Sequence, residues 1–181
     1  MREHDHDRSE APWHVVVAVE DIPETGEHRT LVADVETRLA IARLADVREL
    51  SRLEANFDLL RHDGGGLRVT GRISATVGQN CVVTLEPLVN EIEEDVDLLY
   101  MPAAAAAATD GENAAEPKWD DPEPLIGGAV DLGALATEFV VLGIDPYPRK
   151  PGAVFEPPRD QKPDAGPFAA LAGLMKDRDG H

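Results

Sequence analysis

The chain has 181 residues and a formal net charge of −18 at pH 7, from 35 Asp and Glu against 17 Lys and Arg. Its length suits one domain, and its single cysteine excludes an internal disulfide and a self-contained CxxC zinc pair. Extended contact with nucleic acid needs a basic surface, so the charge disfavours it. No apolar stretch approaches the roughly 20 residues of a membrane span, and the charged N-terminus lacks a signal-like apolar region. We therefore expect a soluble cytoplasmic protein.

The N-terminal third predicts two strands and a helix. We expect residues 1–12 to form a disordered tail before a single domain over residues 13–176. A valine-rich segment predicts a strand from Trp13 to Pro23, and Thr30–Asp34 predicts a second one. Asp34 is a candidate N-cap for a helix over residues 35–46, with three residues on one face: Val35, Leu39 and Ala42.

Alternating apolar and polar residues predict an antiparallel meander in the middle of the chain. A strand over residues 51–62 has four apolar residues on one face: Leu53, Ala55, Phe57 and Leu59. After a glycine-rich turn at Asp63–Gly66, a strand over residues 67–77 repeats the pattern with Leu67, Val69, Gly71, Ile73, Ala75 and Val77. We expect residues 78–80 to break the run and residues 81–101 to continue it, with a common face of Ile92, Val96 and Leu98.

The last third predicts a loop, a helix and an extended segment. Six consecutive alanines, followed by acidic residues, Gly and Pro, predict a mobile loop over residues 103–124. Asp131 is a candidate N-cap and Pro146 a stop for a helix with four apolar residues at helical spacing: Leu132, Leu135, Phe139 and Leu142. We expect the proline-rich residues 151–167 to be extended and residues 177–181 to form a tail.

These elements together predict an α+β fold. We expect an antiparallel β meander or partly closed sheet with a few packed helices and an acidic flexible insertion. A short amphipathic piece follows the proline-rich segment and carries Phe168, Leu171 and either Leu174 or Met175. Because so short a helix is unstable alone, we expect it to dock on another surface.

Cys81 has three possible roles: a nucleophile, a ligand of a shared metal ion, or a structural residue. A reactive thiol needs a nearby cation, base or helix N-terminus to lower its pKa, and its neighbours in sequence supply none. We therefore favour a structural role for Cys81 at the edge of a β-rich run, and we expect Cys81→Ser or Cys81→Ala to leave the function intact.

The segment "EPLVNEIEEDVD" after this cysteine is acidic and contains no basic residue. Paired carboxylates can serve acid–base chemistry or bind a divalent ion, but the run has no EF-hand pattern. Two interpretations remain open: a solvated strand face, or a docking face for a basic partner. Under the second interpretation, the contacting residues are Glu91, Glu93, Glu94 and Asp95.

No catalytic or metal-binding motif is visible in the chain. It has no P-loop, GxGxxG after a strand, GxSxG or HExxH-type spacing, and His4 and His6 lie in the charged N-terminal tail. We expect no enzyme activity, cofactor or bound metal. A metal-dependent hydrolase or nuclease is a disfavoured alternative, because a basic groove and a ligand motif are both missing.

The order of these segments resembles the YceD family of large-ribosomal-RNA-subunit accumulation proteins. The resemblance covers about Trp13 to Lys176, and its most specific pieces are "DLGALATEFVVLGIDPYP" and "PFAALAGLMK". It implies a role in accumulation of the large-subunit (23S) ribosomal RNA, a gene beside that of a small basic ribosomal protein, and no known enzymatic activity. Many relatives have a CxxC pair where this chain has Gly78 and Cys81, which argues against a paired thiol or metal role here.

The resemblance and the charge together favour a non-catalytic ribosome-biogenesis factor. We expect its acidic strand to contact a basic large-subunit ribosomal protein or a precursor particle, with Phe168 and Leu171 as the apolar anchor. The alternative is a general acidic, chaperone-like module that binds basic proteins without a ribosomal role.

Overall fold

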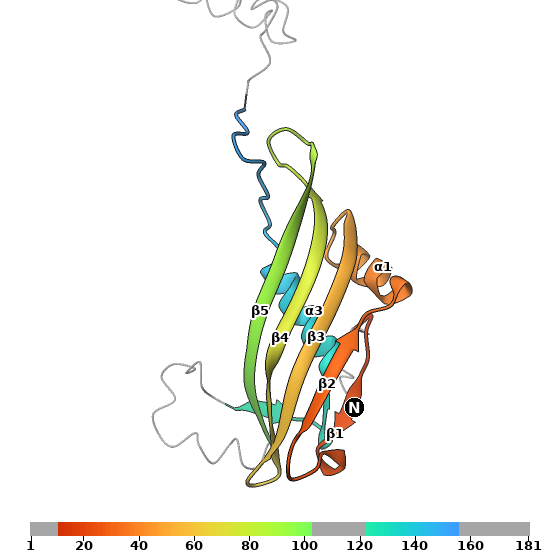
Figure 1. Ribbon diagram of the computed structural model, residues 1–181, viewed down its shortest axis with the longest axis vertical. Coiled ribbons are helices and arrows are strands. Elements are labelled where there is room, and N and C mark those ends of the chain that lie inside the picture. The colour runs from red at the N-terminus through yellow and green to blue at the C-terminus, as the bar shows by residue number, and fades with distance from the viewer. Residues whose placement is uncertain (1–10, 103–121, 156–181) are drawn as a thin grey trace, which may run out of the picture.

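The structure is a computed structural model that describes residues 11–102 and 122–155. Its main element is a tall, twisted sheet with the strand order β2-β3-β4-β5-β6 (Figure 1). All neighbouring strands in it are antiparallel except β5 and β6, which are parallel. The bounds are Glu27–Val32 for β2, Glu49–His62 for β3, Gly66–Asn80 for β4, Pro87–Pro102 for β5 and Glu123–Leu125 for β6.

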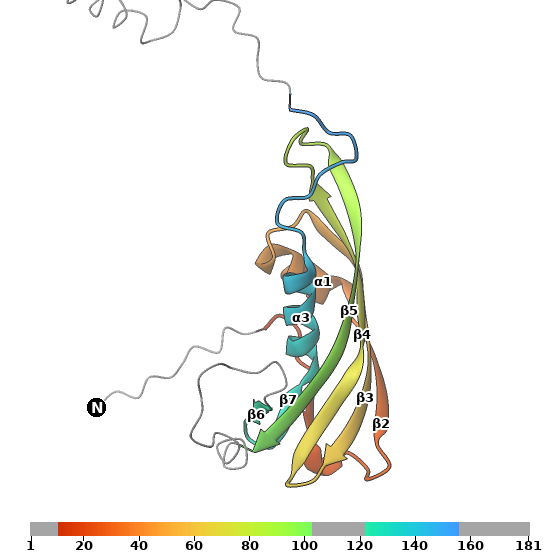
Figure 2. The ribbon, with the colours of Figure 1, turned by 90° about the vertical axis from the view of Figure 1, so that its left-hand side faces the viewer.

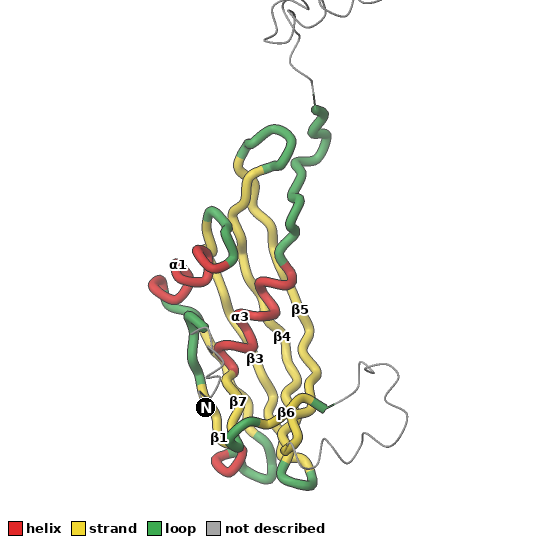
Figure 3. The backbone as a smooth tube through the Cα atoms, turned by 180° about the vertical axis from the view of Figure 1, so that it is seen from behind, coloured by secondary structure: helices red, strands yellow, loops and turns green. Residues whose placement is uncertain are grey.

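Both described α-helices lie on the same face of this sheet, and the opposite face carries no described helix (Figure 2). Helix α1 spans Val35–Leu44, and helix α3 spans Leu132–Gly143 and crosses the long strands (Figure 3). Strands β1 (Val16–Ala18) and β7 (Ala129–Asp131) form a small second sheet next to the start of α3. We call the helix-covered face inner and the other face outer.

The fold is α+β, as expected, but the sheet is not closed. Within residues 11–102 and 122–155, strand β2 pairs only with β3, and β6 pairs only with β5, so these strands lie at opposite ends of the sheet order. Closure of a barrel requires the first and last strands to pair. The expected partly closed sheet is therefore corrected to an open one.

The predicted alternation in the central strands is confirmed. The predicted inward residues of β3 are buried, and those of β4 are buried except Gly71. Gly71 sits where β3 comes very close, and a Cβ placed there would overlap the backbone oxygen of Asn56. Glycine is therefore required at this point of strand contact. On β5, Ile92 and Val96 are buried and Leu98 packs against the core from a partly buried position.

Several strand boundaries differ from the expected ones. The first strand is only three residues long, because Val19–Asp21 form a 3-10 turn in which Ile22 donates to the Val19 carbonyl. Strand β4 continues through residues 78–80, which still pair with β5. The chain then turns at Cys81–Leu85 instead of remaining extended, and the turn is closed by a hydrogen bond from Leu85 N to the Cys81 carbonyl.

The caps of both helices are confirmed, whereas part of each apolar face is not. In α1 the buried residues are Ile41 and Ala42, while Val35 and Leu39 are exposed. In α3 the buried stripe runs through Leu132, Ala136 and Val140, with Leu135 beside it, and Leu142 is 75% exposed. A helix buries only the stripe that faces its partner, so neighbouring apolar positions can remain outside it.

Other expectations fall largely outside the described residues. These are the tail over residues 1–12, the loop over 103–124, the proline-rich segment over 151–167, the amphipathic piece with Phe168 and Leu171, and the tail over 177–181. The last two residues expected in the loop, Glu123 and Pro124, belong to β6.

Candidate functional site

The acidic strand is β5, and it divides the predicted acidic residues between two faces. Glu91, Glu93 and Asp95 lie opposite Thr76, Ser74 and Arg72 of β4, and all six lie on the outer face. Glu94 falls between them and shares the inner face with Ile92 and Val96. There it lies beside the end of α3, where a Cβ added at Gly143 would be 2.8 Å from Glu94 Oε1.

Arginines from β3 and β4 pair with three of the four outer acids of β5. Arg52 Nη2 lies 2.9 Å from Glu91 Oε2, Arg72 Nε lies 2.8 Å from Asp95 Oδ1, and Arg68 Nη2 lies 2.8 Å from Asp97 Oδ2. The sequence run itself contains no base, so the expected uncompensated acidic strand is corrected to a partly paired one. Glu93 and Glu94 have no ion pair among the residues that the structure describes.

These contacts lower the pKa of the paired carboxyls. Hydrogen bonds from Thr76 and Arg52 lower the pKa of Glu91, and a hydrogen bond from Arg72 lowers that of Asp95. Arg68 does the same for Asp97. All three carboxylates therefore remain ionised at neutral pH. Among the strand residues on the outer face of β3–β5, seven acids still face three arginines: Glu49, Glu54, Asp58, Glu91, Glu93, Asp95 and Asp97 against Arg52, Arg68 and Arg72.

Cys81 lies in the turn that joins β4 to β5. It is fully buried, and its Sγ accepts hydrogen bonds from the backbone nitrogens of Thr84 (3.4 Å) and Lys150 (3.3 Å). Lys150 belongs to the segment after α3, residues 144–155, which we call the strap. Two further contacts tie the strap to this turn: Val82 N donates to the Pro148 carbonyl, and Lys150 Nζ pairs with Glu86.

The strap changes the electrostatics of the thiol. Hydrogen bonds lower the pKa of Cys81 to about 6 despite the opposing effect of burial. The largest cause is the backbone N–H of Lys150, followed by the side chain and backbone of Thr84 and then the backbone of Val83. The sequence expectation considered only a nearby cation, base or helix N-terminus, whereas backbone and side-chain hydrogen-bond donors lower this pKa. The largest cause, Lys150, lies 69 positions away in sequence, and Thr84 lies three positions away. The sulfur holds the strap against the hairpin, and Gln79 strengthens this contact by donating to the Asp145 carbonyl.

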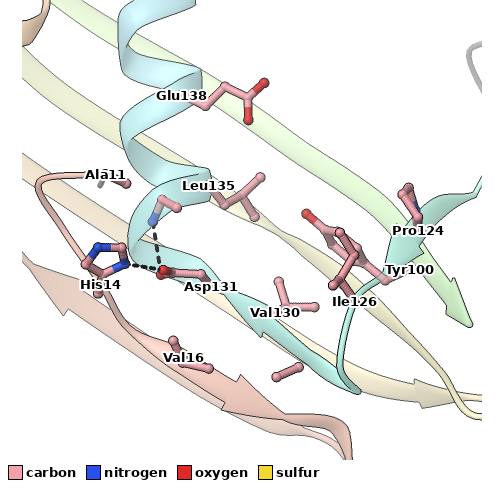
Figure 4. Close-up of a pocket in the computed structure, with 12 residues that line it drawn as sticks. Ala11, His14, Val16, Tyr100, Pro124, Ile126, Val130, Asp131, Leu135 and Glu138 are labelled. Atoms are coloured by element: carbon pink, nitrogen blue, oxygen red, sulfur yellow. Dashed lines mark hydrogen bonds and ion pairs between the residues drawn. The ribbon is translucent and has the colours of Figure 1, made fainter. Parts of the chain in front are cut away.

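A pocket of about 710 Å³ lies between α3, the small sheet and the end of β5 (Figure 4). Its polar side chains come from His14, Tyr100, Asp131 and Glu138, and its walls are apolar. His14 Nδ1 lies 2.6 Å from Asp131 Oδ2, while Asp131 Oδ1 caps α3. Burial and the charges of Glu123 and Glu138 raise the pKa of Tyr100 to about 12, so its hydroxyl stays protonated at neutral pH.

Sequence patterns alone did not identify these partners. The polar alternation of β4 was visible, and it would have placed Arg72 opposite Asp95 had the hairpin register been known. No local pattern joins His14 to Asp131 or Cys81 to Lys150.

Among the described residues, no group of three or more His, Cys, Asp or Glu side chains could hold a metal ion. No described helix is long and apolar enough to cross a membrane.

These features define an α+β protein with an open, mostly antiparallel sheet and a charged outer face. The chain matches the family described as "Large ribosomal RNA subunit accumulation protein YceD" over residues 69–175, more than half of its length, and so it belongs to the YceD family. The match begins in β4 and contains β5, the Cys81 turn and α3. No curated protein and no solved structure matches the chain.

Proposed function

We propose that this protein supports accumulation of the large-subunit (23S) ribosomal RNA in the cytoplasm, without catalysing a reaction, by binding a basic large-subunit ribosomal protein or its precursor particle. The observation that carries the proposal is membership of a family described by large ribosomal RNA subunit accumulation. The matched region includes the acidic strand β5.

The charge of the protein supports a basic protein as the first contact. The chain has a net charge of −18, and the outer face of β3–β5 retains more carboxylates than arginines despite the ion pairs. Such a surface attracts a basic protein and repels the RNA backbone. Glu93 is the best placed contact residue, because it is exposed between Glu91 and Asp95 and has no described ion pair of its own.

The acidic surface would attract a partner, and an apolar contact would add specificity. Phe168 and Leu171, which lie outside the described residues, are the proposed anchor. Of the predicted contact residues, Glu94 is the least suited to outer-face binding, because it is on the inner face.

A gene deletion tests the proposed role directly. Cells without the gene are expected to contain less mature 23S ribosomal RNA and more large-subunit precursor, and the full-length gene restores both. Mature RNA and sedimentation profiles are the measurements. Normal RNA and normal particles in the deletion strain would refute the proposed function.

Complementation with charge variants tests the surface. The triple variant Glu91→Gln, Glu93→Gln, Asp95→Asn is expected to restore the RNA poorly. A matched control removes the same three charges from exposed positions near β1: Glu20→Gln, Asp21→Asn and Glu24→Gln. Equal rescue by both variants would rule out the outer face of β5 as the contact surface.

A pull-down with the full chain, followed by mass spectrometry and RNA sequencing, identifies the partner. Enrichment of large-subunit proteins supports the proposal. Recovery of many unrelated basic proteins, without large-subunit enrichment, would instead indicate a general acidic chaperone-like module. Binding should weaken steeply with salt in either case, so salt sensitivity alone does not decide between them.

A further inference from the structure

We propose that the free edge of β5 binds its partner by strand addition, so that an extended basic segment of another protein pairs with residues 91–99. This inference rests on the proposed function, because it specifies how the acidic strand would bind a basic protein. Unlike attraction by charge alone, strand addition requires the partner to form backbone hydrogen bonds with the sheet.

The edge of β5 is long and unpaired within the described residues. On one side β5 pairs with β4 from Pro87 to Tyr100, and on the other it pairs with β6 only at Tyr100–Pro102. Figure 2 looks onto this second side, and no described strand lies along its middle part. Nine residues of extended chain span about 30 Å, enough to accept a segment of six to eight residues.

A strand edge offers specific chemistry. Every second residue directs both its N–H and its C=O groups away from the neighbouring strand, and these groups form a row of donors and acceptors for an added chain. The opposite edge of the sheet belongs to β2, which is only six residues long and carries mixed charges in Glu27, His28 and Arg29. The edge of β5 is therefore the longer template and the one with a single sign of charge.

The side chains beside this edge select a basic occupant. The outer face next to the edge carries Glu91, Glu93, Asp95 and Asp97, and the inner face carries Ile92, Glu94, Val96 and Leu98. An added strand would place alternate residues against each row. A sequence that alternates Lys or Arg with apolar residues complements both rows. Glu94 is the one charge in the inner row, and a Lys or Arg in place of one of the partner's apolar residues would pair with it.

The same charges disfavour a second copy of this chain. Two β5 strands paired edge to edge would bring acidic residues opposite one another, and directly opposed like charges destabilise a sheet. An inward-pointing charge on an edge strand is also a known safeguard against self-association, and Glu94 fits that description. Residues 103–121 contain five acids and one lysine, and residues 156–167 contain four prolines, so neither sequence suits this edge.

The pocket at the end of this edge fits the same partner. Tyr100 and Pro124 line it where β5 meets β6, and Glu138 borders it from α3. Apolar walls with a carboxylate and an aromatic ring suit the alkyl stem and charged end of a lysine or arginine. One basic side chain of the added strand would occupy it.

Amide hydrogen exchange on the full-length protein tests the proposal, with the eight-residue peptide Lys-Val-Lys-Val-Lys-Val-Lys-Val as the probe. Alternate amides within residues 91–99 are expected to exchange rapidly in the free protein and slowly with the peptide bound. The matched control is the same peptide N-methylated at every residue, which keeps the charges but cannot donate backbone hydrogen bonds. It is expected to give no protection.

The triple variant Glu91→Gln, Glu93→Gln, Asp95→Asn should bind the unmethylated peptide roughly tenfold more weakly than the native chain. The control variant Glu20→Gln, Asp21→Asn, Glu24→Gln should bind it as the native chain does.

Three results would overturn the inference. Equal binding of the methylated peptide would mean that the outer face attracts it by charge alone, which leaves the proposed function intact. In the free protein, slow exchange of the alternate amides of residues 91–99 that face away from β4 would mean that the protein's own chain or a second copy occupies the edge, and sedimentation would separate those two cases. Failure of the peptide to bind would reject strand addition. The RNA measurements in the deletion strain test the proposed function separately.

Discussion

Arg72 on β4 donates a hydrogen bond from Nε to Oδ1 of Asp95, its direct neighbour on β5, over 2.8 Å. Arg68 and Asp97 also share two hydrogen bonds, but diagonally, because Arg68 lies opposite Leu99 and Asp97 lies opposite Thr70. Ion pairs between β4 and β5 therefore line the outer face of this hairpin. Exposed ion pairs of this kind add little to stability, but they determine which carboxylates are already compensated. Glu93 lies between the paired acids Glu91 and Asp95, has no described ion pair of its own, and is therefore the acid with the most electrostatic interaction left to offer a partner.

Removal of one arginine should change the titration of its partner alone. Arg72→Gln is expected to raise the pKa of Asp95 toward its ordinary value, because the hydrogen bond and the charge that lower it are lost. Arg52→Gln, the matched control, should raise the pKa of Glu91 and leave that of Asp95 unchanged. Carboxyl NMR titrations measure both values. An unchanged Asp95 titration in Arg72→Gln would contradict the pairing.

The sign of the accompanying stability effect follows from the same shift. A carboxyl with a lowered pKa in the folded state stabilises the fold above its unfolded pKa, and this contribution is lost as the pH falls through the folded value. The difference in unfolding free energy between the native chain and Arg72→Gln should therefore shrink under acidic conditions. Urea denaturation at several pH values measures it.

Cys81 should titrate far below an ordinary thiol. The backbone N–H groups of Lys150 and Thr84 point at its sulfur and lower its pKa to about 6 from 9.0. Absorbance of the thiolate near 240 nm, followed across pH, should rise with a midpoint near this value. The chain has no other cysteine, so Cys81→Ser is a clean blank. A midpoint near 9 would show that the strap does not hold the sulfur in this way.

The lowered pKa of Cys81 also predicts how the stability of the fold depends on pH. An acid whose folded pKa is about 6 and whose ordinary value is 9.0 stabilises the fold fully above the higher value, and that stabilisation fades as the pH falls through about 6. The native chain should therefore gain stability over Cys81→Ser as the pH is raised from about 6 to about 9. A constant difference between the two chains over that range would contradict the prediction.

Even an alanine side chain at position 71 should destabilise the protein. A Cβ at this position would overlap the backbone oxygen of Asn56, which cannot move without disturbing the pairing of β3 and β4. Gly71→Ala is expected to lower the free energy of unfolding by about 1–3 kcal/mol, the usual cost of overpacking. The adjacent outer-face variant Thr70→Ala should stay within about 0.5 kcal/mol of the native chain. Urea denaturation compares them, and equal stabilities would mean that the strands can separate locally.

Period-two alternation predicted the central sheet from the sequence because β3 and β4 are each buried on one face only. Residues such as Phe57 and Ile73 therefore alternate with polar neighbours throughout both strands. Helix faces were less predictable. Val35 and Leu39 matched helical spacing, yet α1 buries Ile41 and Ala42, since its position relative to β3 decides which stripe is covered.

The partners within the candidate site depend on register and on distant contacts. The pairing of Arg72 with Asp95 follows once the hairpin register is fixed, but a misplaced turn changes every cross-strand neighbour. The sequence predicts the break at residues 78–80, whereas the turn lies at Cys81–Leu85, so the register of β5 does not follow from the predicted break. The contact of Cys81 with Lys150 depends on where the chain goes after α3, which no local pattern encodes.

Asp131 should matter more to the fold than the other helix cap, Asp34. Both side chains accept backbone N–H groups at the start of a helix, Asp34 from Thr37 and Asp131 from Gly133 and Ala134. Asp131 also accepts the Val15 N–H and pairs with His14, which joins α3 to the segment before β1. Asp131→Ala is therefore expected to cost about 1–2 kcal/mol of unfolding free energy, and Asp34→Ala less.

The variant Asp131→Asn distinguishes the stability contributed by the helix cap from the stability contributed by the carboxylate charge. Asp131→Asn keeps an oxygen acceptor for the N–H groups and should retain most of the stability lost in Asp131→Ala. Burial raises the pKa of Asp131, but hydrogen bonds from His14 and the Val15 N–H outweigh it and leave the pKa lowered. The advantage of Asp131 over asparagine should therefore be present at neutral pH and disappear as the pH falls through that lowered value. Urea denaturation of the variants at neutral and acidic pH measures both effects, and equal losses for Asp131→Ala and Asp34→Ala would show that the link to Val15 contributes nothing.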